Sequence, residues 1–111
     1  MKEAPVFVQA YDLHSWLLDR FAGESPLVDV RRGVLEHSRA LLESLTLALA
    51  RFEAGERLVE ADEHAALLRV HLRLANDKEL LDDRQLVHAN RELRDIGRQI
   101  GGWRKHLGKV D

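Results

Sequence analysis

The sequence predicts an all-α protein, a single domain in which four antiparallel helices form an up-down-up-down four-helix bundle. Three observations lead to this prediction. Apolar residues recur at alternating spacings of three and four over most of the chain, which gives each segment one buried helical face. Leu, Ala, Arg and Glu are frequent, whereas proline occurs only twice. Four amphipathic segments with short connections favour an antiparallel bundle, and residues 1–111 suffice for one domain with its own core.

The first helix is expected from about Pro5 to Ala22. Proline suits the first turn of a helix, where its missing N–H is not needed. The apolar stripe of this segment consists of Phe7, Ala10, Leu13, Leu17 and Phe21. Gly23 is expected to end the helix, and Ser25 and Pro26 to start the next one as N-cap and first helical residue.

The second helix is expected over about residues 26–53, with Gly55 as its stop. Its apolar seam consists of Leu27, Val30, Val34, Leu41, Leu45, Ala48 and Phe52, with Ser38 filling one small gap. On the solvated side, the pairs Arg32–Glu36 and Arg39–Glu43 have the i,i+4 spacing of helical ion pairs. A three-helix arrangement with a bent second hairpin is the main alternative, and Gly55 argues against it.

The third helix is expected over about residues 57–76. Its seam consists of Leu58, Ala61, Ala65, Leu68, Leu72 and Ala75. The three alanines predict that a neighbouring helix approaches closely on that side. Arg69, Arg73 and Asp77 share one face near its end. We favour a surface ion pair between Arg73 and Asp77 over a role in fixing the following turn or in a subunit contact.

The fourth helix is expected to begin after Asp82, which acts as N-cap with Gln85 in capping-box register, and to end near residues 105–107. Its seam consists of Leu86, Ala89, Leu93, Ile96, Ile100, Trp103 and Leu107. Three glycines interrupt this helix, and each lowers helix propensity by roughly 1 kcal/mol relative to Ala. A close neighbour is the simplest compensation, so the predicted oligomer interface consists of Gly97, Gly101, Gly102 and Trp103. A core tryptophan beside a frayed helix end is the alternative.

Positive charge gathers on this last helix. Residues 84–109 hold seven Lys or Arg and two acidic residues, whereas the rest of the chain holds ten Lys or Arg and seventeen acidic residues. Four cations fall on the heptad position that faces furthest from the seam, at successive distances of about 10.5 Å along the helix. We call them the cationic face: Arg84, Arg91, Arg98 and Lys105. This spacing favours non-specific binding of nucleic-acid phosphates, and a merely solvated surface is the alternative. Without an aromatic residue on this face, sequence-specific recognition is not expected.

Catalytic and metal chemistry find little support in the sequence. No histidine has a Glu three residues before it, as the di-iron sites of four-helix bundles require. Glu60 and His64 share a helix face, which we interpret as a partly solvated pair. The chain lacks cysteine, a nucleophile elbow and a phosphate-binding glycine loop. We therefore expect a non-enzyme without metal or cofactor, and the absence of a signal peptide or long apolar run favours a cytoplasmic protein without membrane contact.

Residues 94–103, Arg-Asp-Ile-Gly-Arg-Gln-Ile-Gly-Gly-Trp, resemble the tail of a small four-helix-bundle family. That family includes the accessory variability protein of diversity-generating retroelements and proteins encoded in intervening sequences of ribosomal RNA genes. Leu68-Arg69, residues 72–75 and Asp77 resemble its third-helix pattern. The resemblance implies a homopentameric ring and, for the retroelement members, binding to nucleic acid and to a reverse transcriptase.

Two functions from different classes follow from these observations. The first is a non-catalytic oligomeric scaffold that binds nucleic acid, or an enzyme acting on nucleic acid, through the cationic face. The second is a self-associating structural protein without a nucleic-acid partner, in which the cationic face only keeps the protein in solution.

Overall fold

A computed structural model of the chain describes residues 3–21 and 27–110, the last two by their backbone only. These residues form four helices and no strand, which confirms the predicted fold class. The helices are α1 (Pro5–Phe21), α2 (Val28–Leu49), α3 (Ala54–Asp77) and α4 (Asp83–Val110). The predicted boundary residues Ala22, Gly23, Ser25 and Pro26 lie outside the described residues.

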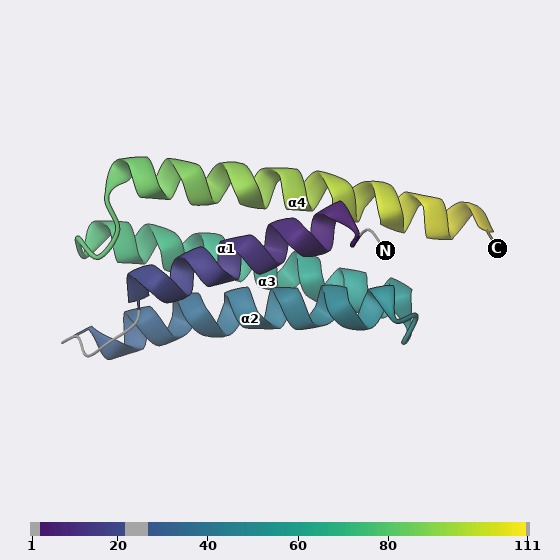
Figure 1. Ribbon diagram of the computed structural model, residues 1–111, viewed down its shortest axis with the longest axis horizontal. Coiled ribbons are helices and arrows are strands. Elements are labelled where there is room, and N and C mark those ends of the chain that lie inside the picture. The colour runs from purple at the N-terminus through teal and green to yellow at the C-terminus, as the bar shows by residue number, and fades with distance from the viewer. Residues whose placement is uncertain (1–2, 22–26, 111) are drawn as a thin grey trace.

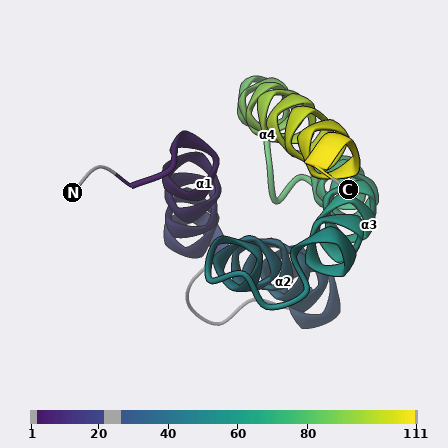
Figure 2. The same ribbon diagram turned by 90° about the vertical axis from the view of Figure 1, so that its right-hand side faces the viewer.

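The helices surround one core, and neighbours in sequence are neighbours in space (Figures 1 and 2). α1 packs on α2, α2 on α3 and α3 on α4, while α4 returns to α1. The contact between α2 and α3 is the most extensive and that between α1 and α4 the least. α4 is the longest helix, and its C-terminal end extends past the turn between α2 and α3 (Figure 1).

The core follows the predicted seams closely. All six seam positions of α3 are buried, and four of α4 are 0% exposed: Ala89, Leu93, Ile96 and Ile100. The three alanines of the α3 seam are buried with it. The stripe of α1 is shifted at its start, where Val6 is buried and Phe7 only half-buried.

The turn between α2 and α3 differs from the prediction. α2 ends at Leu49, not at residue 53, and Gly55 lies inside the first turn of α3. The N–H of Arg51 donates to the carbonyl of Ala48 at 3.0 Å, and that of Phe52 to Leu47 at 3.0 Å. This is a Schellman motif with Arg51 at φ 64°, where glycine is usual. Because no glycine marks this helix end, the sequence placed it too late; Phe52, expected in the seam, is 62% exposed.

α3 ends in the same way. Glu79 has a φ of 64°, and the N–H groups of Glu79 and Leu80 donate to the carbonyls of Asn76 and Ala75. The predicted capping box of α4 then follows: the N–H of Gln85 donates to Asp82 Oδ1 at 2.8 Å, and the N–H of Asp82 donates to Gln85 Oε1 at 3.0 Å.

Two predicted ion pairs of α2 do not form. Arg32 lies 3.7 Å from Asp29, one turn earlier, and not against Glu36. Among the described residues, Arg39 and Glu43 form no ion pair with each other, and neither do Arg73 and Asp77 of α3. Within the described ranges, no helix is long and apolar enough to cross a membrane.

Candidate nucleic-acid interface

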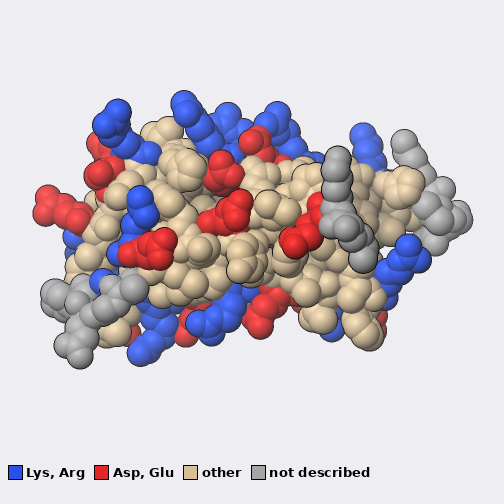
Figure 3. Space-filling view, in the orientation of Figure 1, with Lys and Arg blue, Asp and Glu red and all other residues tan. Residues whose placement is uncertain are grey.

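The cationic face is a continuous exposed surface of α4. Arg84, Arg91, Arg98 and Lys105 are all exposed, as their common heptad position requires. Lys and Arg side chains follow the upper edge of the molecule in Figure 3, where α4 lies. Their surroundings decide which of them can meet an external anion.

Three of the four cations of the cationic face can contact an external anion. Arg84, Arg91 and Lys105 make no hydrogen bond or ion pair with the described part of the chain. Arg98 forms an ion pair with Asp95, and its hydrogen bond holds the pKa of Asp95 below the usual range. Asp95 therefore stays ionised, and Arg98 can offer only part of its charge to a ligand.

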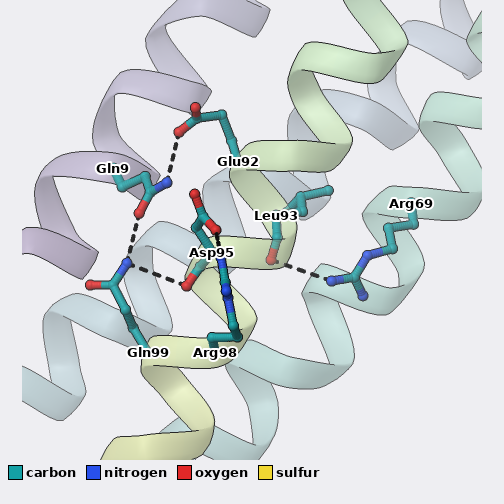
Figure 4. Close-up of polar contacts among 7 residues, drawn as sticks. All are labelled: Gln9, Arg69, Glu92, Leu93, Asp95, Arg98 and Gln99. Carbon is teal, nitrogen blue, oxygen red and sulfur yellow. Dashed lines mark hydrogen bonds and ion pairs between the residues drawn. The ribbon is translucent and has the colours of Figure 1, made fainter.

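The acidic residues beside the cationic face are engaged within the bundle (Figure 4). Gln9 of α1 donates to Glu92 Oε2 at 2.8 Å and accepts from Gln99 Nε2 at 2.7 Å. Asp95 pairs with Arg98, as described above. The two carboxylates between residues 84 and 109 thus point into a polar α1–α4 contact or onto a neighbouring arginine, and the outer face keeps its positive character.

Gly97 has a neighbour within the chain. Arg69 of α3 donates to the carbonyl of Leu93 at 3.3 Å, and a Cβ at Gly97 would lie 3.7 Å from Arg69 Nη2 (Figure 4). At that distance the Cβ would make an ordinary van der Waals contact, so the guanidinium does not require a glycine there. Gly97 therefore lies at the α3–α4 contact, with Arg69 as its neighbour.

Gly101 and Gly102 have no such neighbour. Both are exposed, and among the described residues no side chain would come within 4 Å of a Cβ at either one. They lie in what we call the glycine hollow, about 630 Å³ in volume, which is also lined by Arg98, Arg104 and Lys105. Arg104 is held by Asp62 of α3 at 2.8 Å. The sequence predicts a close neighbour at these two glycines, and none of the described residues provides one.

Trp103 lies half-buried at the edge of the core, where it borders a second hollow. This C-terminal hollow, about 510 Å³ in volume, lies between the last turns of α4 and the α2–α3 turn. Its apolar lining consists of Ala48, Leu49, Ala54 and Leu107, and its other lining residues are Trp103, His106 and Arg51. Trp103 is thus neither a fully buried core residue nor a fully exposed anchor.

No protein-family model, curated protein or solved structure matches the chain.

Two exposed apolar surfaces were not predicted from the sequence. One is a second stripe along the outer face of α3, which consists of Val59, Leu67, Val70 and Leu74. Its 3-4 spacing could have been read from the sequence beside the buried seam. The other is a groove of about 450 Å³ between α1 and α2, lined by Phe7, Tyr11, Leu42, Glu43, Thr46 and Leu47. α1 and α3 lie on opposite sides of the bundle (Figure 2).

A histidine cluster between α2 and α3 was also missed. The Nδ1 atoms of His37 and His64 lie 3.2 Å apart, and the ring of His71 stacks on that of His37 with centroids 4.9 Å apart. The seven-residue interval between His64 and His71, two turns on one face, was the available signal. Three such side chains suggest a metal, but no group of three His, Cys, Asp or Glu in the described ranges can hold one. Glu60, expected beside His64, instead accepts from Arg57 at 3.2 Å.

The cluster predicts that acid weakens the fold. Burial lowers the pKa of His37 below its usual 6.5, and His71 and His64 lower it further, against the opposing effect of Glu36. Burial likewise lowers the pKa of His14. Such a histidine binds a proton more weakly in the folded state than in the unfolded state. Protonation therefore shifts the equilibrium towards the unfolded protein. The histidine's stabilising contribution is present above pH 6.5 and is lost as the pH falls through 6.5 towards the lower folded-state pKa.

Urea unfolding followed by circular dichroism checks this expectation. The free energy of unfolding should fall from about pH 7.5 to about pH 5. His37→Gln should make that fall less steep, whereas His106→Gln, a change at an exposed position near the end of α4, should leave it unchanged. Equal steepness in all three proteins would contradict the assignment to the cluster.

Proposed function

We propose that the chain is a non-catalytic, self-associating four-helix bundle that binds the phosphate backbone of nucleic acid along α4. One observation carries this proposal: Arg84, Arg91 and Lys105 are exposed on one line and unpaired within the described part of the chain, beside carboxylates that are already engaged. Phosphate contacts need only Arg or Lys at reachable positions, and they carry no sequence information. Binding with little sequence preference is therefore expected.

The resemblance of residues 94–103 to the retroelement family supports the same proposal and extends it. It suggests a ring of five copies as the assembly and a reverse transcriptase as a further partner. A ring would place several cationic faces on one particle, which compensates for the few cations that each copy contributes.

A stand-alone structural protein without a nucleic-acid partner is the second candidate. The net charge of −2 favours it, since an acidic body repels a polyanion. The pairing of Arg98 with Asp95 favours it too, because it reduces the charge available on the cationic face.

A binding titration over a range of salt concentrations separates the two candidates. If two or three contacts form on each of a few subunits, the slope of log K against log[salt] should be about −4 to −8, at about 0.9 per phosphate on duplex DNA. Affinity at physiological salt should be on the order of micromolar. Fluorescence anisotropy with unrelated DNA and RNA sequences measures both. No detectable binding at about 50 mM salt would decide for the structural protein.

Self-association draws support from two unlike apolar surfaces, the outer stripe of α3 and the groove between α1 and α2. A cyclic ring needs a heterologous contact, in which two different surfaces of the same chain meet. Light scattering at tens of micromolar is therefore expected to give a homo-oligomer, most simply a pentamer. A mass of 12.7 kDa, that of one chain, would contradict this part of the proposal.

Two kinds of variant locate the contact. Val70 is 65% exposed, so Val70→Lys should break an interface at the α3 stripe and leave the fold intact. Gly101→Ala and Gly102→Ala meet no atom of the described chain within 4 Å and each should favour the helix by up to about 1 kcal/mol. If Gly101→Ala or Gly102→Ala dissociates the oligomer while the melting temperature stays the same or rises, a neighbouring subunit contacts these glycines. Gly55→Ala, which also meets no neighbour, is the matched control and should leave the assembly unchanged.

A further inference from the structure

We propose that the end of α4 captures an unpaired base of a single-stranded nucleic acid in the C-terminal hollow, while Arg51 on the wall of the hollow holds an adjoining phosphate. This inference rests on the proposed function and names the substrate class of that surface. The cationic face itself carries no aromatic residue, and the aromatic surface is supplied by Trp103 of the seam.

The C-terminal hollow has the chemistry that a nucleobase needs. Its volume of about 510 Å³ is within the range of roughly 300–1,000 Å³ that is usual for small-ligand sites. Four apolar side chains, the indole of Trp103 and the imidazole of His106 line it, and a base binds to such surfaces through its flat face. No described carboxylate lines this hollow.

One cation lines the C-terminal hollow and can hold the sugar-phosphate backbone. Arg51 lies on its wall, and its side chain makes no hydrogen bond or ion pair with the described part of the chain. Lys105 and the glycine hollow lie on the opposite face of the same helical turns, because Lys105 follows Trp103 by two residues, about 200° around the helix. A strand whose base stacks on Trp103 therefore meets Arg51 first, and it reaches Lys105 by passing around the end of α4.

The opposite wall of the hollow is held in an unusual conformation. Arg51 lines the hollow from the α2–α3 turn with a φ of 64°, and two backbone hydrogen bonds of the Schellman motif fix it there. A non-glycine residue in the left-handed region is strained, and such residues gather at functional sites. The turn thereby holds an arginine on the wall of the hollow.

Single strands are favoured over duplexes by this geometry. In a duplex the faces of the bases are covered by their stacked neighbours, so only phosphates can reach the protein. An unpaired base can enter the hollow, and stacking on an aromatic residue strengthens binding by roughly 5- to 150-fold per base. A duplex is left with the cationic face alone.

Fluorescence of Trp103 tests this directly. Trp16→Phe leaves Trp103 as the single tryptophan; Trp16 itself lies at the α1–α4 contact, against His88 and Arg20. The full-length variant is titrated with a single-stranded oligonucleotide, an abasic oligonucleotide of equal length, and a duplex. The single strand is expected to quench Trp103 and to bind roughly 5- to 150-fold tighter than the abasic strand. The abasic strand and the duplex are expected to bind without quenching.

A matched pair of variants tests the wall of the hollow. Arg51→Gly keeps the left-handed turn and removes the guanidinium, so it should weaken binding of the single strand more than binding of the duplex. Glu79→Gly makes the same backbone change at the α3–α4 turn, where φ is also 64°, and should weaken neither.

The outcomes separate this inference from the proposed function. Single-strand binding without a change in Trp103, or equal affinity for the abasic strand, would overturn the base site and leave backbone binding in place. No binding of any nucleic acid would overturn both. Quenching and tight binding by poly-glutamate of matched charge would also overturn it, because the hollow would then be a docking site for an acidic peptide.

Discussion

Replacing Leu93 or Leu68 by Ala is expected to lower the free energy of unfolding by about 2–5 kcal/mol. Both side chains are 0% exposed and lie on facing seams of α4 and α3. Truncation removes apolar burial and leaves a cavity that rigid neighbouring helices fill only in part. Urea melts of the two variants measure the decrease.

Arg32→Ala is the control for these core changes. Its side chain is 61% exposed, and its contact with Asp29 at 3.7 Å is a surface pair of little energetic weight. The free energy of unfolding should change by no more than about 0.5 kcal/mol. If either leucine variant were as mild as this one, the assignment of the heptad seam would be wrong.

Gly33→Ala is expected to destabilise the protein by about 1–3 kcal/mol, although Ala is the better helix former. A Cβ at this position would lie 2.3 Å from Nδ1 and 3.1 Å from Cγ of His71. The imidazole cannot move away freely, because its other face stacks on His37. The added methyl group must therefore displace the ring or separate α2 from α3.

A double-mutant cycle attributes this effect to His71. In the background of His71→Ala the ring is gone, and Gly33→Ala should become neutral or stabilising. Gly55→Ala, which meets no neighbour within 4 Å, should not destabilise either protein. A decrease in stability at Gly33 that persists without His71 would mean that another contact opposes the methyl group.

The parts of the fold that depend on local pattern were predictable. The α3 seam, the central seam of α4 and the capping box at Asp82 were all predicted correctly, because periodicity and cap chemistry are properties of short stretches of sequence. The ends of the helices were less predictable. Arg51 and Glu79 close α2 and α3 in a conformation that glycine usually adopts, so a search for glycine placed the end of α2 too late.

Contacts between helices could not be predicted in the same way. The fit of His71 against Gly33, and the stacking of that ring on His37, depend on how far α2 is shifted along α3. Likewise, the sequence placed four cations on one face, but only side-chain geometry separates the occupied Arg98 from the free Arg91. The C-terminal hollow arises where α4 extends past a turn that the sequence placed four residues too late.

The most direct test of backbone binding along α4 compares two double variants with the same reduction in positive charge. Arg84→Gln with Arg91→Gln removes two free cations from the cationic face. Arg32→Gln with Arg73→Gln removes two exposed arginines from α2 and α3. The measurement is the slope of log K against log[salt] for duplex DNA. We expect the first pair to flatten the slope by about 1 for each phosphate that the protein no longer neutralises, with little change in melting temperature, and the second pair to keep the native slope. Equal slopes for the two pairs would contradict a binding site on α4.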